Sequence, residues 1–268
     1  MNDISNKPLR FRTIWISDTH LGTNGVKVDE LLHFLKNTQS ETLYLVGDII
    51  DGWQIKKRFF WPQKHNDVVQ KILRKARNST KVIYIPGNHD EAARDYINYS
   101  FGEIEIHMDY IHHTSKGERL WVVHGDLFDN VIQHARWLAY IGDRAYVTLL
   151  QANRLLNRFR QLLNLPYWSF SQYLKHKVKS AVSFISAFET AMVTEARRRN
   201  CDGVVCGHIH KPEIREIDGI RYYNDGDWVE SVTAMVEHHD GRIEILNWAN
   251  MAHAKTVPTS LTPIVGAR

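Results

Sequence analysis

Three short apolar runs in the first third of the chain each end in a polar segment that carries metal-ligand side chains. Residues 13–16 lead into Asp18, residues 43–46 into Asp48, and residues 82–85 into Asn88. Apolar runs of this length, bounded by glycine and polar residues, are typical of buried strands. Polar residues at the carboxyl ends of neighbouring strands meet in one crevice. The pattern therefore predicts an α/β fold with a functional site at one edge of a sheet.

The sequence around these runs completes the fold prediction. Apolar residues at helical spacing in segments 31–35 and 68–76 predict helices between the strands. After residue 107 the pattern changes, and the turn pairs Asp218-Gly219 and Asp240-Gly241 predict β-hairpins. We expect two packed mixed β-sheets flanked by helices.

Five polar blocks occur in order along the chain, four of them directly after an apolar run and the fifth after residues 203–206. One block alone is most often a solvated loop, but five in order at strand ends predict a shared metal site, because carboxylates, imidazoles and amide oxygens are metal ligands. Side chains at i and i+2 lie on the same face of an ideal strand, and we expect turns after these strands, which the adjacent glycines permit. The blocks are Asp18-Thr19-His20, Gly47-Asp48-Ile49-Ile50-Asp51, Gly87-Asn88-His89-Asp90, His124-Gly125-Asp126 and Gly207-His208-Ile209-His210.

This ordered set resembles the calcineurin-like metallophosphoesterase superfamily, and the resemblance spans the chain from Asp18 to His210. It implies two divalent cations, with Mn²⁺ expected and Fe²⁺ or Zn²⁺ as alternatives, that polarise phosphoryl oxygens and lower the pKa of a shared water. Asp48 would bridge the two. The resemblance implies that one cation is held by Asp18, His20, Asp48 and His210, and the other by Asp48, Asn88, His124 and His208.

Two further residues of the third block receive catalytic roles from the same resemblance. His89 is not a ligand in the superfamily, and we expect it to stabilise the phosphoryl charge or to protonate the leaving group. Asp90 is expected to fix the orientation of the His89 imidazole.

Within the superfamily, the chain is most similar to the UDP-2,3-diacylglucosamine pyrophosphohydrolases of lipid A biosynthesis. Segments 17–21 and 47–53 and an insertion between the fourth and fifth blocks carry this likeness, although those enzymes have Arg at the position of His89. The resemblance implies hydrolysis of a lipid-linked substrate such as UDP-2,3-diacylglucosamine, with another phospholipid, polyisoprenyl or nucleotide-linked phosphate as the alternative. The residues near the family's substrate contacts are Asn88, His89, Asp129, Lys175, Lys177 and Lys179.

The insertion, residues 130–170, has apolar residues at steps of four and three from Val131 to Leu163. This stripe predicts helices, which either pack as plain core or form a cap that holds acyl chains. The expected organisation is a core of residues 1–129 plus 171–250, this insertion, and a tail of residues 251–268.

Charge is unevenly distributed. Residues 130–199 contain eleven Lys or Arg against three Asp or Glu, whereas the whole chain has a net charge of +4. Such a segment favours an anionic partner, and an anionic membrane surface is expected. A nuclease is an alternative, since aromatic residues such as Trp137 lie among the cations, but a packed helical stripe does not suit a nucleic-acid groove. A non-enzymatic scaffold is the other alternative, and the intact set of ligand residues disfavours it.

Only two cysteines are present, Cys201 and Cys206, which fits a reducing compartment. We see no signal peptide in residues 1–12 and no apolar run long enough to span a membrane. The expected location is the cytoplasm, with peripheral attachment to the inner membrane, and no protein partner is implied.

Overall fold

The computed structural model describes residues 7–131 and 185–254. The chain divides into two compact units, Met1–His124 with Ala196–Arg268, and Gly125–Glu195. Every described strand belongs to the first unit. In the second unit, the described residues include the 3-10 helix η2 (Asp126–Val131) and helical residues from 185 onward. The predicted insertion lies almost wholly outside the described residues, so its boundaries stay a prediction.

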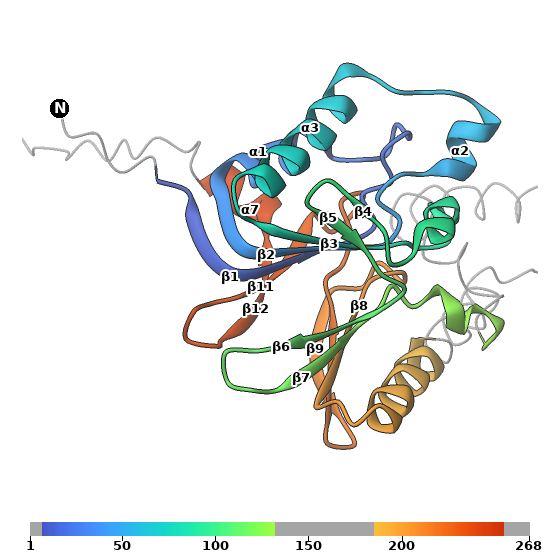
Figure 1. Cartoon of the computed structure of the whole chain (residues 1–268), viewed down its shortest axis with the longest axis vertical. Helices are drawn as coiled ribbons and strands as arrows, with labels where there is room; N and C mark the ends of the chain where they lie inside the picture. Colours follow the sequence, from blue (N-terminus) through green and yellow to red (C-terminus); the bar gives the residue numbers. More distant parts are fainter. Residues whose placement is uncertain (1–6, 132–184, 255–268) are drawn as a thin grey trace, which may run out of the picture. The chain divides into compact units, whose positions relative to one another are not determined.

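The larger sheet has seven strands in the order β12-β11-β1-β2-β3-β5-β4 (Figure 1). Strands β1, β2, β3 and β5 are parallel, and the other three pair antiparallel. The three predicted runs lie within β1, β2 and β3, so their polar blocks emerge at one edge. The strands are β1 (Leu9–Ile16), β2 (Thr38–Val46), β3 (Lys81–Ile85), β4 (Ser100–Phe101), β5 (Ile104–Ile106), β11 (Thr233–Glu237) and β12 (Ile243–Asn247).

The smaller sheet has five strands in the order β6-β7-β8-β10-β9. Its strands β7, β8 and β10 are parallel, so their carboxyl ends lie side by side. These ends are Val122, Cys206 and Asn224. The predicted turn pairs join β9 to β10 and β11 to β12, as expected. The strands are β6 (Tyr110–His113), β7 (Arg119–Val122), β8 (Gly203–Cys206), β9 (Glu213–Ile217) and β10 (Ile220–Asn224).

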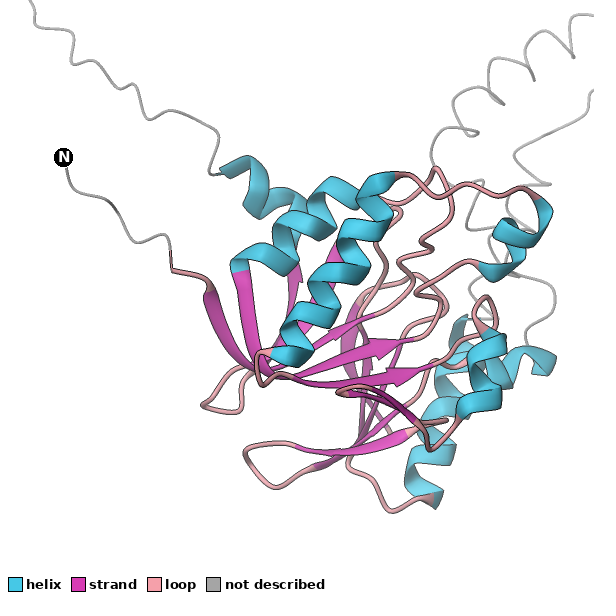
Figure 2. Cartoon of the chain, turned by 45° about the horizontal axis from the view of Figure 1, so that its top comes forward, coloured by secondary structure: helices cyan, strands magenta, loops and turns pink. Residues whose placement is uncertain are grey.

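Two hydrophobic cores lie on opposite faces of the larger sheet, because successive residues of a strand face opposite ways. On β1, Ile14 and Ile16 face the helices α1 (Val28–Asn37), α3 (Gln63–Arg77) and α7 (Trp248–Ala254), which Figure 2 shows on one face of the sheet. Trp15 faces the other way and packs with Val122 and Val205 of the smaller sheet. The predicted arrangement of two mixed sheets flanked by helices is therefore confirmed.

Two expectations concern the C-terminal tail and membrane-spanning helices. Helix α7 continues to Ala254, past the expected start of the tail at residue 251. Its Trp248 is buried, and its Met251 packs against the hydrophobic core on the helix-covered face of the larger sheet. None of the described helices has the length and apolarity that crossing a membrane requires.

A charged cluster is buried between the two sheets. Glu237 on β11 accepts hydrogen bonds from Thr13 Oγ1 (2.9 Å), Arg12 Nη1 (2.6 Å) and the backbone N–H of Ser115 (2.7 Å). His112 Nε2 lies 3.0 Å from the same carboxylate. Burial alone would raise the pKa of Glu237, but these donors hold it at about 2. We call these residues the inter-sheet cluster.

Candidate metal centre

The ends of β1 and β2 bring the first three predicted ligands together. The backbone N–H of Asp18 donates to Gly47 O (3.0 Å), and that of His20 donates to Asp48 O (2.9 Å). These bonds extend the pairing of two parallel strands into the loops beyond them. Asp18, His20 and Asp48 are all buried, so their charges are removed from bulk water.

Five predicted ligands adopt left-handed backbone conformations that residues other than glycine rarely adopt. Such strain costs on the order of 1–3 kcal/mol per residue and is concentrated at functional sites. The conformation bends the chain, so that side chains at i and i+2 can converge. The expected turns are therefore present, but the ligand residues themselves supply much of the bend. Their φ angles are 48° at Asp18, 47° at His20, 52° at Asp48, 69° at His208 and 53° at His210.

The glycines of the third and fifth blocks act mainly by making room. A Cβ on Gly207 would lie 2.3 Å from Ser17 Oγ and 2.5 Å from Asp18 Oδ2. A Cβ on Gly87 would lie 2.3 Å from Asp48 Oδ1. Both distances are far below van der Waals contact, so any larger residue would displace a candidate ligand.

The predicted ligands form two groups, in each of which the ligand atoms lie within 4.8 Å of one another. In the first group, His210 Nε2 lies 3.0 Å from Asp18 Oδ1. In the second, His124 Nε2 lies 3.4 Å from Asp48 Oδ1. His20 Nε2 lies 3.7 Å from Asp18 and 3.9 Å from Asp48, so it connects the groups. The groups are Asp18, His20 and His210, and Asp48, His124 and His208.

Asn88, the remaining predicted ligand, is buried on the loop after β3. Its neighbour Gly87 abuts Asp48, and the backbone N–H of His89 donates to Asp48 Oδ1 (2.8 Å). The structure thus brings six of the seven predicted ligands together at the carboxyl ends of the strands, with Asn88 on a loop beside them; we call this place the crevice.

The imidazoles of His20 and His124 are oriented as metal-binding histidines usually are, with one ring nitrogen held by the protein. Nδ1 of His20 is 3.1 Å from Asp51 Oδ2, and Nδ1 of His124 is 2.8 Å from Val46 O. Each Nε2 therefore points toward the carboxylates. His20 Nε2 is buried and has no hydrogen-bond partner among the residues that the structure describes. This mixed nitrogen and oxygen donor set, without thiolate, fits divalent cations such as Mn²⁺, Fe²⁺ or Zn²⁺.

The electrostatics of the crevice also suit a cation. Burial opposes ionisation of Asp18, but His210 and His20 hold its pKa well below the ordinary value. The pKa of Asp48 is likewise lowered, against burial, by His124. Burial also disfavours the charged form of His20, yet Asp18 and Asp51 raise its pKa to about 10. A divalent cation bound here would replace protons that the carboxylates otherwise draw onto the imidazoles.

The structure corrects the role expected for Asp90. Its carboxylate accepts hydrogen bonds from the backbone N–H groups of Gly87 (2.6 Å) and Ile49 (2.8 Å), so it ties the second block to the third. The neighbour of His89 is instead Asp51, whose Oδ2 lies 3.0 Å from His89 Nδ1. Asp90 follows His89 in sequence, but its side chain is directed into the backbone turn.

Asp51 is thus a site residue that was not assigned a role from sequence. Its Oδ2 lies near both His20 and His89, and burial of its charge is outweighed by these imidazoles, which lower its pKa. The sequence feature that could have identified Asp51 is its position as the last residue of the second block. Asp225 is a second case: it is buried, accepts a hydrogen bond from Ser17 Oγ (2.7 Å), and had no sequence signal.

The expected substrate contacts beyond the third block are not placed. The backbone of Asp129 lies in η2, and nothing is described of its side chain. Lys175, Lys177 and Lys179 lie outside the described residues.

Comparison with known families shows which family the chain belongs to. The model of the calcineurin-like phosphoesterase family matches residues 11–212, a range that includes all five blocks. The chain belongs to the calcineurin-like phosphoesterase family. Members of this family are metal-dependent hydrolases of phosphate esters, and the two ligand groups of this phosphoesterase are candidate metal sites.

Individual relatives are distant. A UDP-2,3-diacylglucosamine hydrolase of Neisseria gonorrhoeae is 23% identical over 223 residues, which cover 80% of this phosphoesterase and 88% of the relative. The DNA polymerase II small subunit of Methanothermobacter thermautotrophicus is 25% identical over 168 residues, 51% of this chain, and the match spans only 35% of that relative's length. Among solved structures, the E. coli phosphoesterase Yfce is 17% identical, with a TM-score of 0.40 and coverage of 88% of this chain and 98% of its own.

Proposed function

We propose that the chain is a dinuclear metal-dependent pyrophosphohydrolase that acts on a lipid-linked nucleotide such as UDP-2,3-diacylglucosamine. The observation that carries the metal chemistry is the presence of two ligand groups in one buried crevice, with His20 Nε2 between Asp18 and Asp48. The diacylglucosamine hydrolase relative, which matches most of both chains, supports the substrate class. The alternative is a phosphodiesterase or phosphatase that acts on another phospholipid or nucleotide.

The proposed ligands follow from the two groups. One cation would be held by Asp18, His20, Asp48 and His210, and the other by Asp48, Asn88, His124 and His208. When bound, two divalent cations, proposed as Mn²⁺, would polarise the phosphoryl oxygens and lower the pKa of the attacking water. Asp48 is the candidate bridge, because its two oxygens face different imidazoles: Oδ1 lies near His124 and Oδ2 near His20.

The remaining residues of the crevice position a proton donor. Water adds to phosphorus, the bond from phosphorus to the bridging oxygen breaks, and that oxygen must gain a proton or keep a stabilised charge. His89 would meet this need, since its Nδ1 lies 3.0 Å from Asp51 Oδ2 and its Nε2 lies 3.9 Å from Asp48 Oδ2, beside the proposed metal bridge. The Trp53 ring lies 4.3 Å from the imidazole, centroid to centroid, and limits its movement.

The lipid part of the proposal depends on the insertion. Its apolar stripe would accept acyl chains, and Asp129, Lys177 and Lys179 would contact the substrate's polar groups. The protein would then work in the cytoplasm, attached peripherally to the inner membrane. Burial of acyl methylenes is worth about 0.8 kcal/mol each, so a chain of about ten carbons can dominate binding.

Turnover of a substrate panel tests the proposal. Purified protein with added Mn²⁺ would receive UDP-2,3-diacylglucosamine, its deacylated form, phospholipids, single-stranded nucleic acid and an aryl phosphodiester, with products identified by mass spectrometry. We expect the acylated nucleotide to give UMP and the acylated sugar 1-phosphate, with a KM that rises sharply as the acyl chains shorten. An equal KM for the acylated and deacylated forms would refute lipid recognition, and preferential cleavage of nucleic acid would favour a nuclease.

A further inference from the structure

The segment after the second block presents an exposed aromatic ring beside three cations. Helix α2 (Gly52–Lys57) and residues 58–61 form what we call the α2 segment. Phe59 is 76% exposed, and Lys56, Lys57 and Arg58 before it are also exposed. None of these three cations has an ion-pair partner among the residues described. A single exposed apolar residue is ordinary, but a phenyl ring next to three exposed cations is typical of segments that bind membrane interfaces.

The segment is anchored, so the exposure of Phe59 is a property of the fold. The next two residues turn inward: the Phe60 and Trp61 rings lie 5.7 and 5.6 Å from the ring of His65, centroid to centroid. Trp61 also packs against the hydrophobic core on the helix-covered face of the larger sheet. His65 is itself buried and accepts a hydrogen bond from the backbone N–H of Gly22 (2.9 Å). Phe59 thus projects outward between an ordered helix and an ordered aromatic anchor.

The α2 segment begins at the crevice. Asp51 caps α2 by accepting a hydrogen bond from the backbone N–H of Gln54 (2.8 Å) on Oδ1, while Oδ2 faces His20 and His89. Six helical residues and two extended ones span roughly 15 Å from Asp51 to Phe59. A surface that touches Phe59 is therefore close to the candidate metal centre.

We propose that the α2 segment docks the protein on an anionic lipid bilayer, with the Phe59 ring in the interface and the three cations against the headgroups. The crevice would then open beside the membrane, where a lipid-linked substrate resides. This role deepens the proposed function and rests on it for the substrate, but binding to a bilayer requires no turnover. Charge complementarity selects the occupant, because cations at an anionic membrane surface gain about 1 kcal/mol each and an aromatic ring suits the interface.

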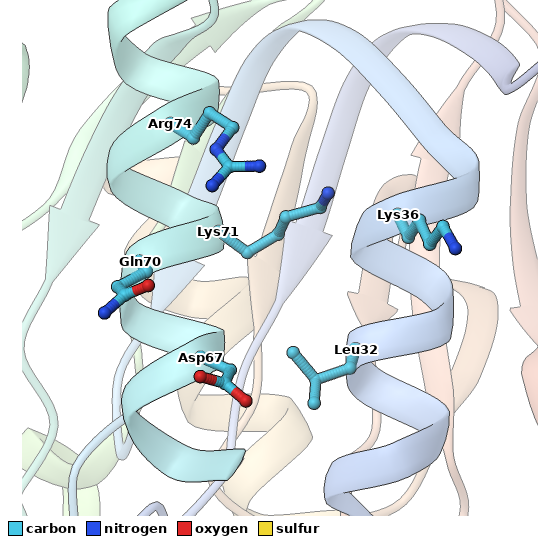
Figure 3. A pocket seen from close by; sticks show the side chains of 6 residues that line it. All are labelled: Leu32, Lys36, Asp67, Gln70, Lys71 and Arg74. Atoms are coloured by element: carbon cyan, nitrogen blue, oxygen red, sulfur yellow. The ribbon is translucent and has the colours of Figure 1, made fainter. Parts of the chain in front are cut away.

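The groove between α1 and α3 provides a matched control. It has a volume of about 290 Å³ and carries Lys36 on α1 and Lys71 and Arg74 on α3 (Figure 3). Its only apolar lining residue is Leu32. The groove therefore has as many cations as the α2 segment, without an exposed aromatic ring.

Co-sedimentation of the full-length protein with vesicles tests the docking. We expect binding to vesicles of phosphatidylglycerol mixed with phosphatidylcholine and little to phosphatidylcholine alone. Replacing Lys56, Lys57 and Arg58 together with Gln should weaken partitioning roughly 100-fold, about fivefold per cation, and Phe59→Ser about tenfold. The controls should stay within about threefold of wild type: Lys36, Lys71 and Arg74 replaced together with Gln, and the exposed Phe101 replaced with Ser.

Three results would overturn the docking. These are unchanged partitioning of the α2 variants, equal loss in the controls, or loss of affinity for a single-stranded oligonucleotide with vesicle binding intact. Turnover of a soluble aryl phosphodiester, which we expect to be unchanged in the α2 variants, verifies that they are folded. If the α2 variants lose vesicle binding but wild type does not cleave the lipid-linked nucleotide, the proposed substrate fails and the docking stands. If wild type cleaves that nucleotide but the α2 variants partition unchanged, the substrate stands and the docking fails.

Discussion

Two clusters of buried charge in this protein differ in how their charges are satisfied. In the inter-sheet cluster, both oxygens of Glu237 receive hydrogen bonds from the protein: Oε1 from the Ser115 N–H, and Oε2 from Thr13 and Arg12. In the crevice, Asp18 and Asp48 face imidazoles at 3.0 to 3.9 Å, and both aspartates, together with His20 and His210, are held in left-handed conformations.

The difference separates a structural charge from a functional one. A buried carboxylate that is saturated with donors stabilises the fold and has no capacity left for a ligand. Several carboxylates and imidazoles that converge on one volume, at a cost in backbone strain, are in the arrangement that a cation needs. The groove between α1 and α3 has neither feature, since none of its charged lining residues is fully buried and none has a left-handed backbone.

The largest expected effect is the loss of Asp48. Asp48→Asn should lower kcat/KM by on the order of 10³- to 10⁵-fold, because several kcal/mol of charge stabilisation by metals would be lost. Metal analysis should show that most of both cations are lost, and circular dichroism should show that the fold is kept. Two metal ions per chain in this variant would rule out Asp48 as the bridge.

His89→Ala should leave the metals in place and lower kcat by roughly 10²- to 10⁴-fold, the usual contribution of a proton donor. The measurement requires the physiological diphosphate, because an aryl phosphate has a good leaving group that needs no protonation. Activity within a few-fold of wild type would remove His89 from the mechanism.

Glu237→Gln should have the reverse profile, with a loss of stability and little change in activity. The folded-state pKa of about 2 lies below the ordinary 4.5, so the carboxylate contributes stability that is complete above pH ~4.5 and is lost as the pH falls toward ~2. The difference is worth about 3 kcal/mol.

Urea unfolding in the presence of a chelator measures this contribution without interference from metal release. The gap in unfolding free energy between wild type and Glu237→Gln should be widest near neutral pH and should narrow below pH ~4.5. A difference in unfolding free energy that does not depend on pH would contradict the stabilising role of the Glu237 carboxylate. A large loss of activity at neutral pH would show that the inter-sheet cluster also contributes to function.

The smallest effect is expected in the groove between α1 and α3. Replacing Lys36, Lys71 and Arg74 together with Gln should change kcat/KM less than about twofold and stability by no more than ~0.5 kcal/mol per site. A tenfold loss of activity would show that the cations of this groove contribute to function, contrary to this expectation.

The parts of the site that were predictable from sequence depend on local pattern. The strand ends at Ile16, Val46 and Ile85 follow from short apolar runs, and the order of the five blocks selects the seven candidate ligands. The parallel pairing of β1, β2 and β3 then brings their loops to one edge. The fold class could be predicted for the same reason, because it follows from the same local pattern of apolar runs.

The remaining features depend on long-range geometry. Glu237 meets Arg12 across 225 residues of sequence, and no periodicity encodes that contact. Asp51 lies beside His89, and Asp90 accepts backbone hydrogen bonds instead. This difference depends on the direction in which each side chain leaves its turn, and the left-handed residue Asp48 lies in that region. The exposure of Phe59 depends on the inward packing of Phe60 and Trp61 against His65.

The central claim is that the crevice holds two cations in a defined arrangement, and anomalous diffraction from crystals soaked in Mn²⁺ tests it most directly. We expect two peaks about 3.5 to 4 Å apart, one contacted by Asp18, His20, Asp48 and His210 and the other by Asp48, Asn88, His124 and His208. The competing position is the group of His20, Asp51 and His89, which also brings three ligand atoms together. A single peak, or a peak at that third group in place of the other two, would contradict the account.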